Sequence, residues 1–195
     1  MICNFFSIKL YLIQIRNSIR FEIKPTEEDY LAFQLFAASQ SERIQKRIRN
    51  SKWLISGIFL ISALFNYFDG ENLFLTIYFI AFSLACIVFY KRYALWIYKR
   101  HFKKHGQEVY SKKFDQPAIV EFTEKALYTS DFTGEGKYYY SQLISAPETD
   151  NHFFITQNPG IGIIIPKRDL INIDEFRDEI LSHGIPIEYF KGWKW

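Results

Sequence analysis

The sequence predicts an α+β protein with a two-helix transmembrane hairpin and a small antiparallel β-sheet or partial barrel capped by a C-terminal helix. Residues 53–68 and 73–90 are two apolar runs without a charged residue, and only Asp69-Gly70-Glu71-Asn72 separates them. From residue 115 onward the pattern changes, because apolar and polar residues alternate between turn residues, as they do in strands. The chain therefore combines a membrane-like part with a sheet-forming part.

We divide the chain into five segments on these patterns. They are a leader at residues 1–20, an N-terminal strand and amphipathic helix at 21–50, the transmembrane hairpin at 51–92, a basic juxtamembrane helix at 93–106, and a cytosolic β domain with a C-terminal helix at 107–195. The leader is rich in β-forming residues. It does not have the pattern of a cleavable signal, because Lys9 interrupts its apolar stretch.

A short strand and a capped helix open the segment at 21–50. Phe21-Glu22-Ile23 alternates like a strand, and we expect it to complete the C-terminal sheet, because a small sheet with an open edge is marginally stable. Thr26 and Asp29 have the spacing of a capping box, in which each side chain accepts a hydrogen bond from the backbone N–H of the other residue. Residues 30–50 are compatible with a helix that becomes basic along its length.

Both apolar runs are predicted to cross a membrane. A bilayer core about 30 Å thick needs roughly 20 apolar residues, and these runs come close to that length. The alternative is a pair of buried core helices, but surface helices of soluble proteins have a polar face, whereas these runs are apolar all round. The short turn makes the two helices antiparallel neighbours, and several small residues would let them approach closely. These are Ser56, Gly57, Ala81, Ser83 and Ala85.

The basic residues are concentrated at the two outer ends of the hairpin, although the net charge is only +3, from 24 basic and 21 acidic residues. They are Arg43, Lys46, Arg47, Arg49 and Lys52 before it, and Lys91, Arg92, Lys99, Arg100, Lys103 and Lys104 after it. A local basic excess beside apolar runs indicates anionic lipid and membrane topology rather than nucleic acid. We therefore expect membrane lipids as partners, no nucleic acid, and both termini in the cytoplasm.

The C-terminal part contains five candidate strands followed by one helix. The strands are residues 118–123, 126–132, 137–143 with an extension toward Glu148, 151–157 and 162–165. Asn172 is a candidate N-cap for a helix over Ile173–Ser182, which His183-Gly184 would end. Residues 185–195 are expected to add a strand or to lie at the membrane.

Three features together resemble the YcxB-like family of small bacterial membrane proteins. They are FEIKPTEEDYLAF (Phe21–Phe33), the two-span hairpin, and Ile144–Leu170, in which Pro166-Lys167-Arg168 follows an apolar strand. The resemblance covers residues 21–182. It implies a multi-pass protein of the bacterial cytoplasmic (inner) membrane with a pleckstrin-homology-like cytosolic domain, and it implies no catalytic residues.

The sequence contains none of the short motifs that mark common enzyme classes, such as a P-loop or a nucleophile elbow, so we expect no enzymatic activity. His101 and His105 have a spacing that could place both imidazoles on one metal ion. Lys103 and Lys104 disfavour a cation there, and no acidic or cysteine ligand is near in sequence. We therefore expect neither a metal nor a cofactor.

The expected function is that of a membrane-anchored cytosolic interaction domain that binds a protein partner, a second copy of itself or anionic lipid headgroups, and a regulatory role would suit it. The alternative is a subunit of an oligomeric small-solute transporter or channel, but the spans lack the charged groups of an ion relay. The candidate contacts with anions are Lys167 and Arg168 after the last strand, and Arg43, Lys46 and Arg47 before the hairpin. The simpler interpretation is that these are solvated charges or topology signals.

Overall fold

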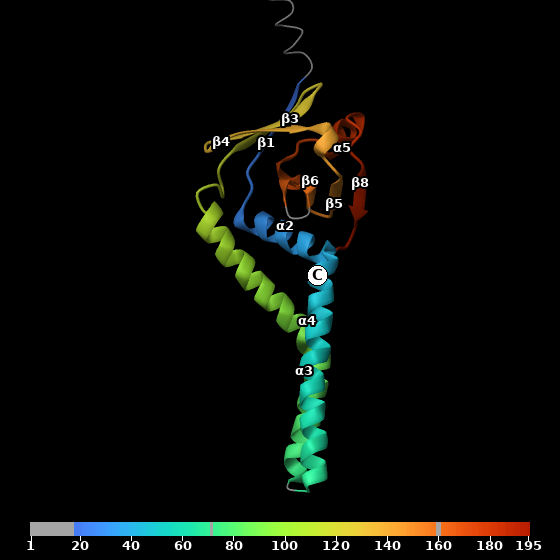
Figure 1. Ribbon diagram of the computed structural model, residues 1–195. Helices are drawn as coiled ribbons and strands as arrows, with labels where there is room; N and C mark the ends of the chain where they lie inside the picture. Colours follow the sequence, from blue (N-terminus) through green and yellow to red (C-terminus); the bar gives the residue numbers. More distant parts are fainter. Residues whose placement is uncertain (1–17, 71, 159–160) are drawn as a thin grey trace, which may run out of the picture. The chain divides into compact units, whose positions relative to one another are not determined.

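The computed structural model describes residues 18–70, 72–158 and 161–195 (Figure 1). Residues 1–17 of the expected leader lie outside the described residues, as do Glu71 and the turn residues 159–160. The chain forms two compact units. One contains the described residues up to Phe33 together with His105–Lys194, and the other contains Gln34–Lys104 with Trp195. The N-terminal strand therefore belongs to the same unit as the C-terminal β domain.

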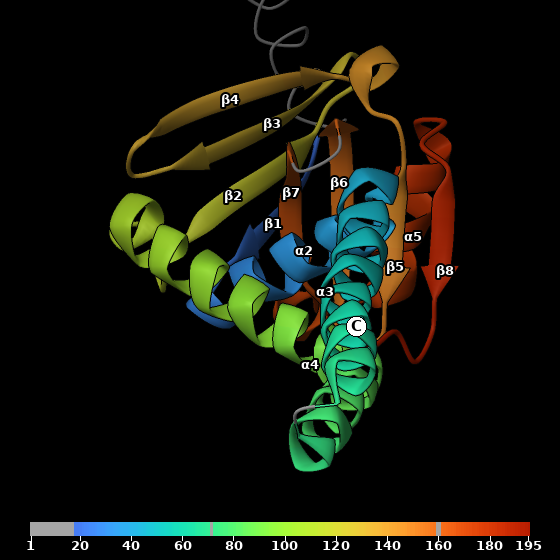
Figure 2. The ribbon, with the colours of Figure 1, turned by 60° about the horizontal axis from the view of Figure 1, so that its bottom comes forward.

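The first sheet of this unit is antiparallel and contains the N-terminal strand at one edge (Figure 2). Its order is β1-β2-β3-β4, with β1 at Ile19–Ile23, β2 at Ala118–Phe122, β3 at Ala126–Asp131 and β4 at Gly134–Tyr139. The register of β1 and β2 places Phe21 opposite Val120 and Ile23 opposite Ala118. The expectation that Phe21-Glu22-Ile23 completes the C-terminal sheet is therefore confirmed.

The second sheet is mixed, which corrects the prediction of a single antiparallel sheet. Its order is β7-β6-β5-β8, with β5 at Ala146–Thr149, β6 at His152–Asn158, β7 at Ile161–Pro166 and β8 at Ile187–Phe190. A 3₁₀ turn, η1 (Tyr140–Gln142), divides the run expected as one strand toward Glu148, so β5 belongs to a different sheet from β4. Strand β8 pairs with β5 in parallel, which is possible because the intervening chain supplies the long crossover that parallel pairs need.

The helix expected at Ile173–Ser182 is present with those bounds as α5. The Asn172 side chain accepts hydrogen bonds from the backbone N–H groups of Asp174 and Glu175, at 3.1 and 3.2 Å, so the predicted N-cap is confirmed. Phe176 of α5 is fully buried and contacts Phe21 of β1 and Phe153 of β6, with ring centroids 4.8 and 5.1 Å apart. The helix thus joins the two sheets into one core.

The helix expected over residues 30–50 is two helices, α2 (Glu27–Gln40) and α3 (Glu42–Asp69). The Ser41 side chain accepts a hydrogen bond from the backbone N–H of Ile44 at 3.4 Å and caps α3, because serine competes with backbone groups for hydrogen bonds and favours helix starts. By contrast, the second span and the expected juxtamembrane helix at 93–106 form one continuous helix, α4 (Leu73–Tyr110). Residues 91–105 contain neither glycine nor proline to end it.

Helices α3 and α4 run side by side over the two apolar runs (Figure 1). The Ser83 hydroxyl donates a hydrogen bond to the backbone carbonyl of Ser56 at 2.9 Å, and Ala63 and Thr76 are also buried. Among the small residues expected at this contact, Ser56 and Ser83 are buried, whereas Ala81 and Ala85 are exposed. Close approach therefore occurs along one stripe of each helix.

We predict that Phe176→Ala destabilises the β-containing unit strongly, by about 3–5 kcal/mol, because it removes a fully buried ring from the junction of both sheets. Thermal unfolding of the detergent-solubilised full chain measures the effect. The control is Glu175→Ala on the exposed side of the same helix, which should change stability by no more than about 0.5 kcal/mol. Equal losses in the two variants would contradict the packing described above.

Candidate functional site

The predicted capping box at the start of α2 is present and its acidic member is buried. The backbone N–H and the hydroxyl of Thr26 donate to Asp29 Oδ2 at 2.7 and 2.8 Å, and the backbone N–H of Asp29 donates to Thr26 Oγ1 at 3.4 Å. The Asp29 side chain is only 3% exposed. A carboxylate at this depth needs more donors than one cap supplies.

Arg168 and His152 supply those donors from the C-terminal part of the chain. Arg168 lies in a 3₁₀ turn, η2 (Lys167–Asp169), and its Nη1 and Nη2 atoms donate to the two carboxylate oxygens of Asp29 at 2.7 and 2.6 Å. Arg168 Nη2 also donates to the backbone carbonyl of Lys24 at 3.2 Å. His152 Nε2 at the start of β6 lies 2.8 Å from Asp29 Oδ1. This bidentate geometry is the strongest form of an arginine–carboxylate pair.

The protonation of this cluster follows from its geometry. Burial alone would raise the pKa of Asp29, but hydrogen bonds from Arg168, His152 and Thr26 outweigh burial and hold that pKa far below its usual value. The hydrogen bonds to Asp29 also raise the pKa of Arg168. Asp29 is therefore an anion at every physiological pH.

Lys167, the neighbouring cation, belongs to a second internal cluster around Glu148. Lys167 Nζ donates to Glu148 Oε1 at 2.7 Å, and Arg177 of α5 donates to both oxygens of Glu148 from Nη2 and Nε at 2.9 and 3.1 Å. The Glu148 side chain is 7% exposed. Burial would raise the pKa of Glu148, but the hydrogen bonds from Arg177 and Lys167 lower it.

Lys167 and Arg168 were expected as contacts for an outside anion, and the structure gives both of them partners within the chain. Each has an internal carboxylate partner, and the Lys167 side chain is only 15% exposed, although that of Arg168 is 49% exposed. The simpler interpretation, solvated charges beyond a strand end, does not include these internal ion pairs. Contact of these two residues with an outside anion stays a prediction, but the two cations primarily hold strands and helices of the protein together.

The other three candidates, Arg43, Lys46 and Arg47, lie in the first turns of α3 and are exposed. Within the described ranges none of them has an ion-pair partner. A cation in the first turn, such as Arg43, is disfavoured by the helix dipole, so its presence is not explained by helix stability. The structure places these three residues in a different compact unit from Lys167 and Arg168. We call Arg43, Lys46 and Arg47 the α3 collar.

Basic and apolar residues also meet at the end of the second apolar run. A groove of about 530 Å³ is lined by Lys91 and Arg92 and by four apolar or aromatic residues, which are Val88, Phe89, Leu95 and Trp195. The Trp195 ring lies against that of Tyr98, with centroids 5.4 Å apart. In the part of the chain that the structure describes, Lys91 and Arg92 have no ion-pair partner. In this groove and in the α3 collar, the positive charges are not neutralised by an ion pair with a described residue.

The apolar runs themselves present their side chains outward. Helices α3 and α4 are both long and apolar enough to cross a membrane, and 11% of the most apolar 18-residue stretch of each is buried. Large exposed residues include Leu64, Phe65, Phe74 and Val88. The alternative of two buried core helices would require the opposite distribution.

His101 and His105 do not form a metal site with other described residues, because no group of three or more His, Cys, Asp or Glu side chains in the described part of the chain is arranged to hold a metal ion. His105 Nδ1 lies 3.1 Å from the hydroxyl of Tyr30, which belongs to α2. The histidine thus links the end of α4 to the start of α2 within the first unit.

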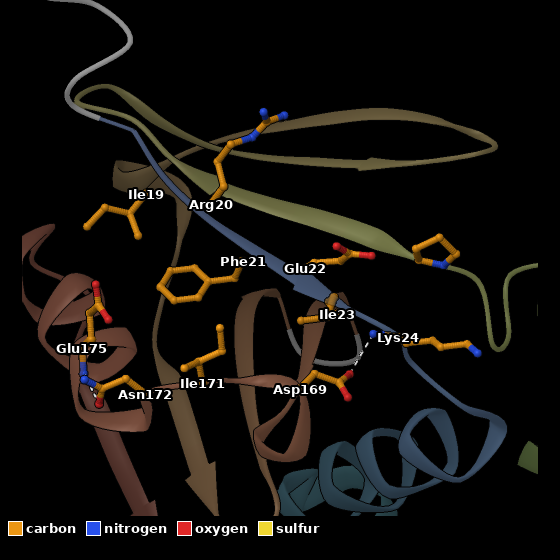
Figure 3. Close-up of a pocket in the computed structure, with 11 residues that line it drawn as sticks. Ile19, Arg20, Phe21, Glu22, Ile23, Lys24, Asp169, Ile171, Asn172 and Glu175 are labelled. Carbon is orange, nitrogen blue, oxygen red and sulfur yellow. Dashed lines mark hydrogen bonds between the residues drawn. The ribbon is translucent and has the colours of Figure 1, made fainter.

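A surface groove follows the edge strand β1 (Figure 3). It has a volume of about 510 Å³ and is lined by Ile19–Lys24, Pro117 and a second segment that includes Asp169, Ile171 and Glu175. The backbone N–H of Lys24 donates to Asp169 Oδ2 at 2.7 Å and closes one end of the groove. The sequence indicated that Phe21-Glu22-Ile23 is a strand, but not that its outer side borders a groove.

A chain with two sheets, a packed C-terminal helix and two helices able to span a membrane is of the mixed helix-and-sheet class. Residues 122–180, from the last residue of β2 into α5, match the family model described as YcxB-like protein. The match confirms the family resemblance for this segment, which is less than half of the chain. No curated protein and no solved structure matches the sequence.

We predict that Asp29→Asn lowers the free energy of unfolding at neutral pH by about 3 kcal/mol, because Arg168 and His152 lose the anion between them. The folded-state pKa of Asp29 lies below its unfolded value near 4, so Asp29 stabilises the fold fully above about pH 4 and progressively less as the pH falls. The difference between wild type and variant should therefore narrow in acid.

Thermal unfolding of the full chain in detergent across that pH range measures this difference. Glu28→Gln is the matched control, because it removes a carboxylate from the same helical turn but from an exposed position. A constant difference at all pH values, or an equal loss in Glu28→Gln, would contradict the role assigned to Asp29.

Proposed function

We propose that this chain is a membrane-anchored interaction protein without catalytic activity. The α3–α4 hairpin crosses the bacterial cytoplasmic membrane twice, both termini lie in the cytoplasm, and the cationic ends of the hairpin bind anionic lipid headgroups. The observation that carries the proposal is the combination of outward-facing apolar helices with Arg43, Lys46, Arg47, Lys91 and Arg92, which are exposed and have no ion-pair partner among the described residues.

The orientation rests on the distribution of charge. Lys and Arg residues flank the outer ends of both runs, whereas the acidic residues Asp69 and Glu71 stand between the two runs in the sequence. Short loops rich in Lys and Arg stay on the cytoplasmic side. The turn between α3 and α4 is therefore the part that reaches the other side.

Lipid binding is favoured over a purely topological role by the character of the two cationic surfaces. The groove beside Lys91 and Arg92 combines cations with the apolar side chains of Val88, Phe89 and Leu95, which suits a phosphate headgroup above an acyl chain. Arg43, Lys46 and Arg47 provide a second exposed set. Lys167 and Arg168 contribute less to this proposal, because their charges are balanced by Glu148 and Asp29.

We further propose that the β-containing unit has the pleckstrin-homology-like architecture that the family resemblance implies, and that it acts as the interaction domain. Two sheets joined by the C-terminal helix α5, with the YcxB-like segment spanning most of them, support this assignment.

The proposed topology predicts opposite labelling of two introduced cysteines. In a background with Cys3→Ser and Cys86→Ser, Asn72→Cys should react with a membrane-impermeant maleimide in whole cells, because it lies in the turn between the spans. Ser182→Cys at the end of α5 should react only after the membrane is permeabilised. Labelling of the cysteine at position 182 in intact cells would refute the orientation.

The lipid proposal predicts that Arg43→Gln, Lys46→Gln and Arg47→Gln together reduce the preference for phosphatidylglycerol over phosphatidylcholine by at least about threefold, because three cations leave the membrane surface. Electron spin resonance of spin-labelled lipids at the reconstituted full chain measures this preference. Added salt should weaken the wild-type preference toward that of the triple variant.

The matched control removes three exposed lysines from the other unit, with Lys112→Gln, Lys125→Gln and Lys191→Gln. The control carries the same change of net charge and should retain the wild-type preference. If both triple variants lost the lipid preference equally, or neither lost it, the α3 collar would have no role in lipid binding beyond setting the membrane topology.

A further inference from the structure

Strand β1 has a partner strand on one side alone among the described residues, because it is the edge of the sheet β1-β2-β3-β4. An edge strand presents a row of backbone N–H and C=O groups that can pair with another strand. The groove of about 510 Å³ runs along this edge, so the side chains around β1 leave room beside it (Figure 3). Ile171 borders the groove and is fully exposed, which leaves an apolar side chain next to the unpaired strand.

The sequence of β1 is self-complementary when two copies are placed antiparallel. The strand reads Ile19-Arg20-Phe21-Glu22-Ile23, with an aromatic residue at the centre, opposite charges on either side of it, and isoleucines at both ends. If Phe21 faces Phe21 of a second copy, Arg20 faces Glu22 of that copy and Glu22 faces its Arg20. Directly opposite residues of an antiparallel pair interact most strongly, and opposite charges at such positions are favourable.

We propose that β1 pairs antiparallel with β1 of a second copy of this chain, which joins the two four-stranded sheets into one eight-stranded sheet about a two-fold axis. Such an isologous contact requires a surface that is complementary to itself, and the charge order of β1 meets that requirement. The occupant of the groove is thus a second copy of the chain.

The intramolecular contacts of Arg20 support this pairing. Arg20 is opposite Glu121 of β2, and its Nε atom lies 3.3 Å from Glu121 Oε2. In the pair of copies, Arg20 lies between Glu121 of its own chain and Glu22 of the other. Glu22 is exposed and is opposite the apolar Ile119 on β2, so within its own sheet it has no cation across the strand. The second copy supplies that cation.

In the extended sheet, the core-side residues of the two copies would lie on one face and their exposed residues on the other. Side chains alternate along β1, and Phe21 and Ile23 lie on the side that packs on the core, whereas Arg20 and Glu22 are exposed. A two-fold axis perpendicular to the sheet keeps the core-side residues of both copies on one face. Ile171 then lies beside the junction, where the neighbouring copy can cover it.

A five-residue strand pair is a small contact, so it should be populated where the copies are concentrated and not in dilute detergent. The inference depends on the proposed membrane anchoring in one respect, because anchoring would raise the local concentration of the copies. The self-pairing itself rests on β1. A failure of the topology test therefore leaves the pairing to be judged by the experiment below.

The experiment measures energy transfer between full-length copies reconstituted in phosphatidylcholine vesicles. The copies carry donor or acceptor on Ser182→Cys in the background with Cys3→Ser and Cys86→Ser. Arg20→Glu alone and Glu22→Arg alone should each weaken association by about tenfold, because two like-charge contacts form across the two-fold axis. An equal mixture of the two variants should restore association to near the wild-type level, because every contact is again between opposite charges.

Two controls separate the pairing from stability. Glu121→Gln breaks the intramolecular ion pair of Arg20 without changing the edge, and it should leave energy transfer high. If Arg20→Glu fails to fold, a mixture of Arg20→Cys and Glu22→Cys copies, each lacking Cys3 and Cys86, should form an inter-copy disulfide more readily than either alone. Folded single variants that associate like wild type, or a mixture that restores nothing, would overturn the proposal.

Discussion

The first compact unit depends most on the carboxylate of Asp29, because this one buried group holds three distant segments together. It caps α2 through Thr26, accepts two hydrogen bonds from Arg168 in η2, and bonds His152 at the start of β6. A buried carboxylate is costly unless donors surround it, and here Arg168 and His152 supply donors from more than a hundred positions away in addition to Thr26. The start of α2 is consequently a part of the β-containing unit rather than an extension of the α3–α4 pair.

Internal ion pairing divides the cations of this protein into two groups with different roles. Lys167 and Arg177 form ion pairs with the buried carboxylate of Glu148, and Arg168 forms one with that of Asp29. These ion pairs hold β5, η2, α2 and α5 together. Five cations near the ends of the apolar runs have no such partner among the described residues, and they are Arg43, Lys46, Arg47, Lys91 and Arg92. Exposed cations without an internal partner attract anionic lipid headgroups more strongly than cations that a buried carboxylate already neutralises.

The features that were predicted correctly from the sequence are those determined by residues close to one another in the chain. The capping residues Thr26 and Asn172, the bounds of α5 and the alternating strands all follow from neighbouring residues. The errors concern long-range partners. Nothing near Glu148 in sequence indicates that it is buried under Arg177, and nothing near residue 187 indicates a parallel partner, because both depend on how α5 crosses the sheets. Ser41 is a local signal for a new helix start, but it was missed because the residues on both sides of it favour a helix.

The edge strand β1 carries a charge pattern that permits association with a second copy. Proteins commonly guard an edge strand with charges of one sign, since two copies of such a strand repel each other. Strand β1 instead carries one charge of each sign, Arg20 and Glu22, in an order that attracts an antiparallel copy. A membrane anchor would hold all copies in one orientation and confine them to a surface. Contact through β1 would then join the copies in pairs, because each copy has one β1 strand. The same strand that completes the sheet within one chain is therefore suited to join two chains.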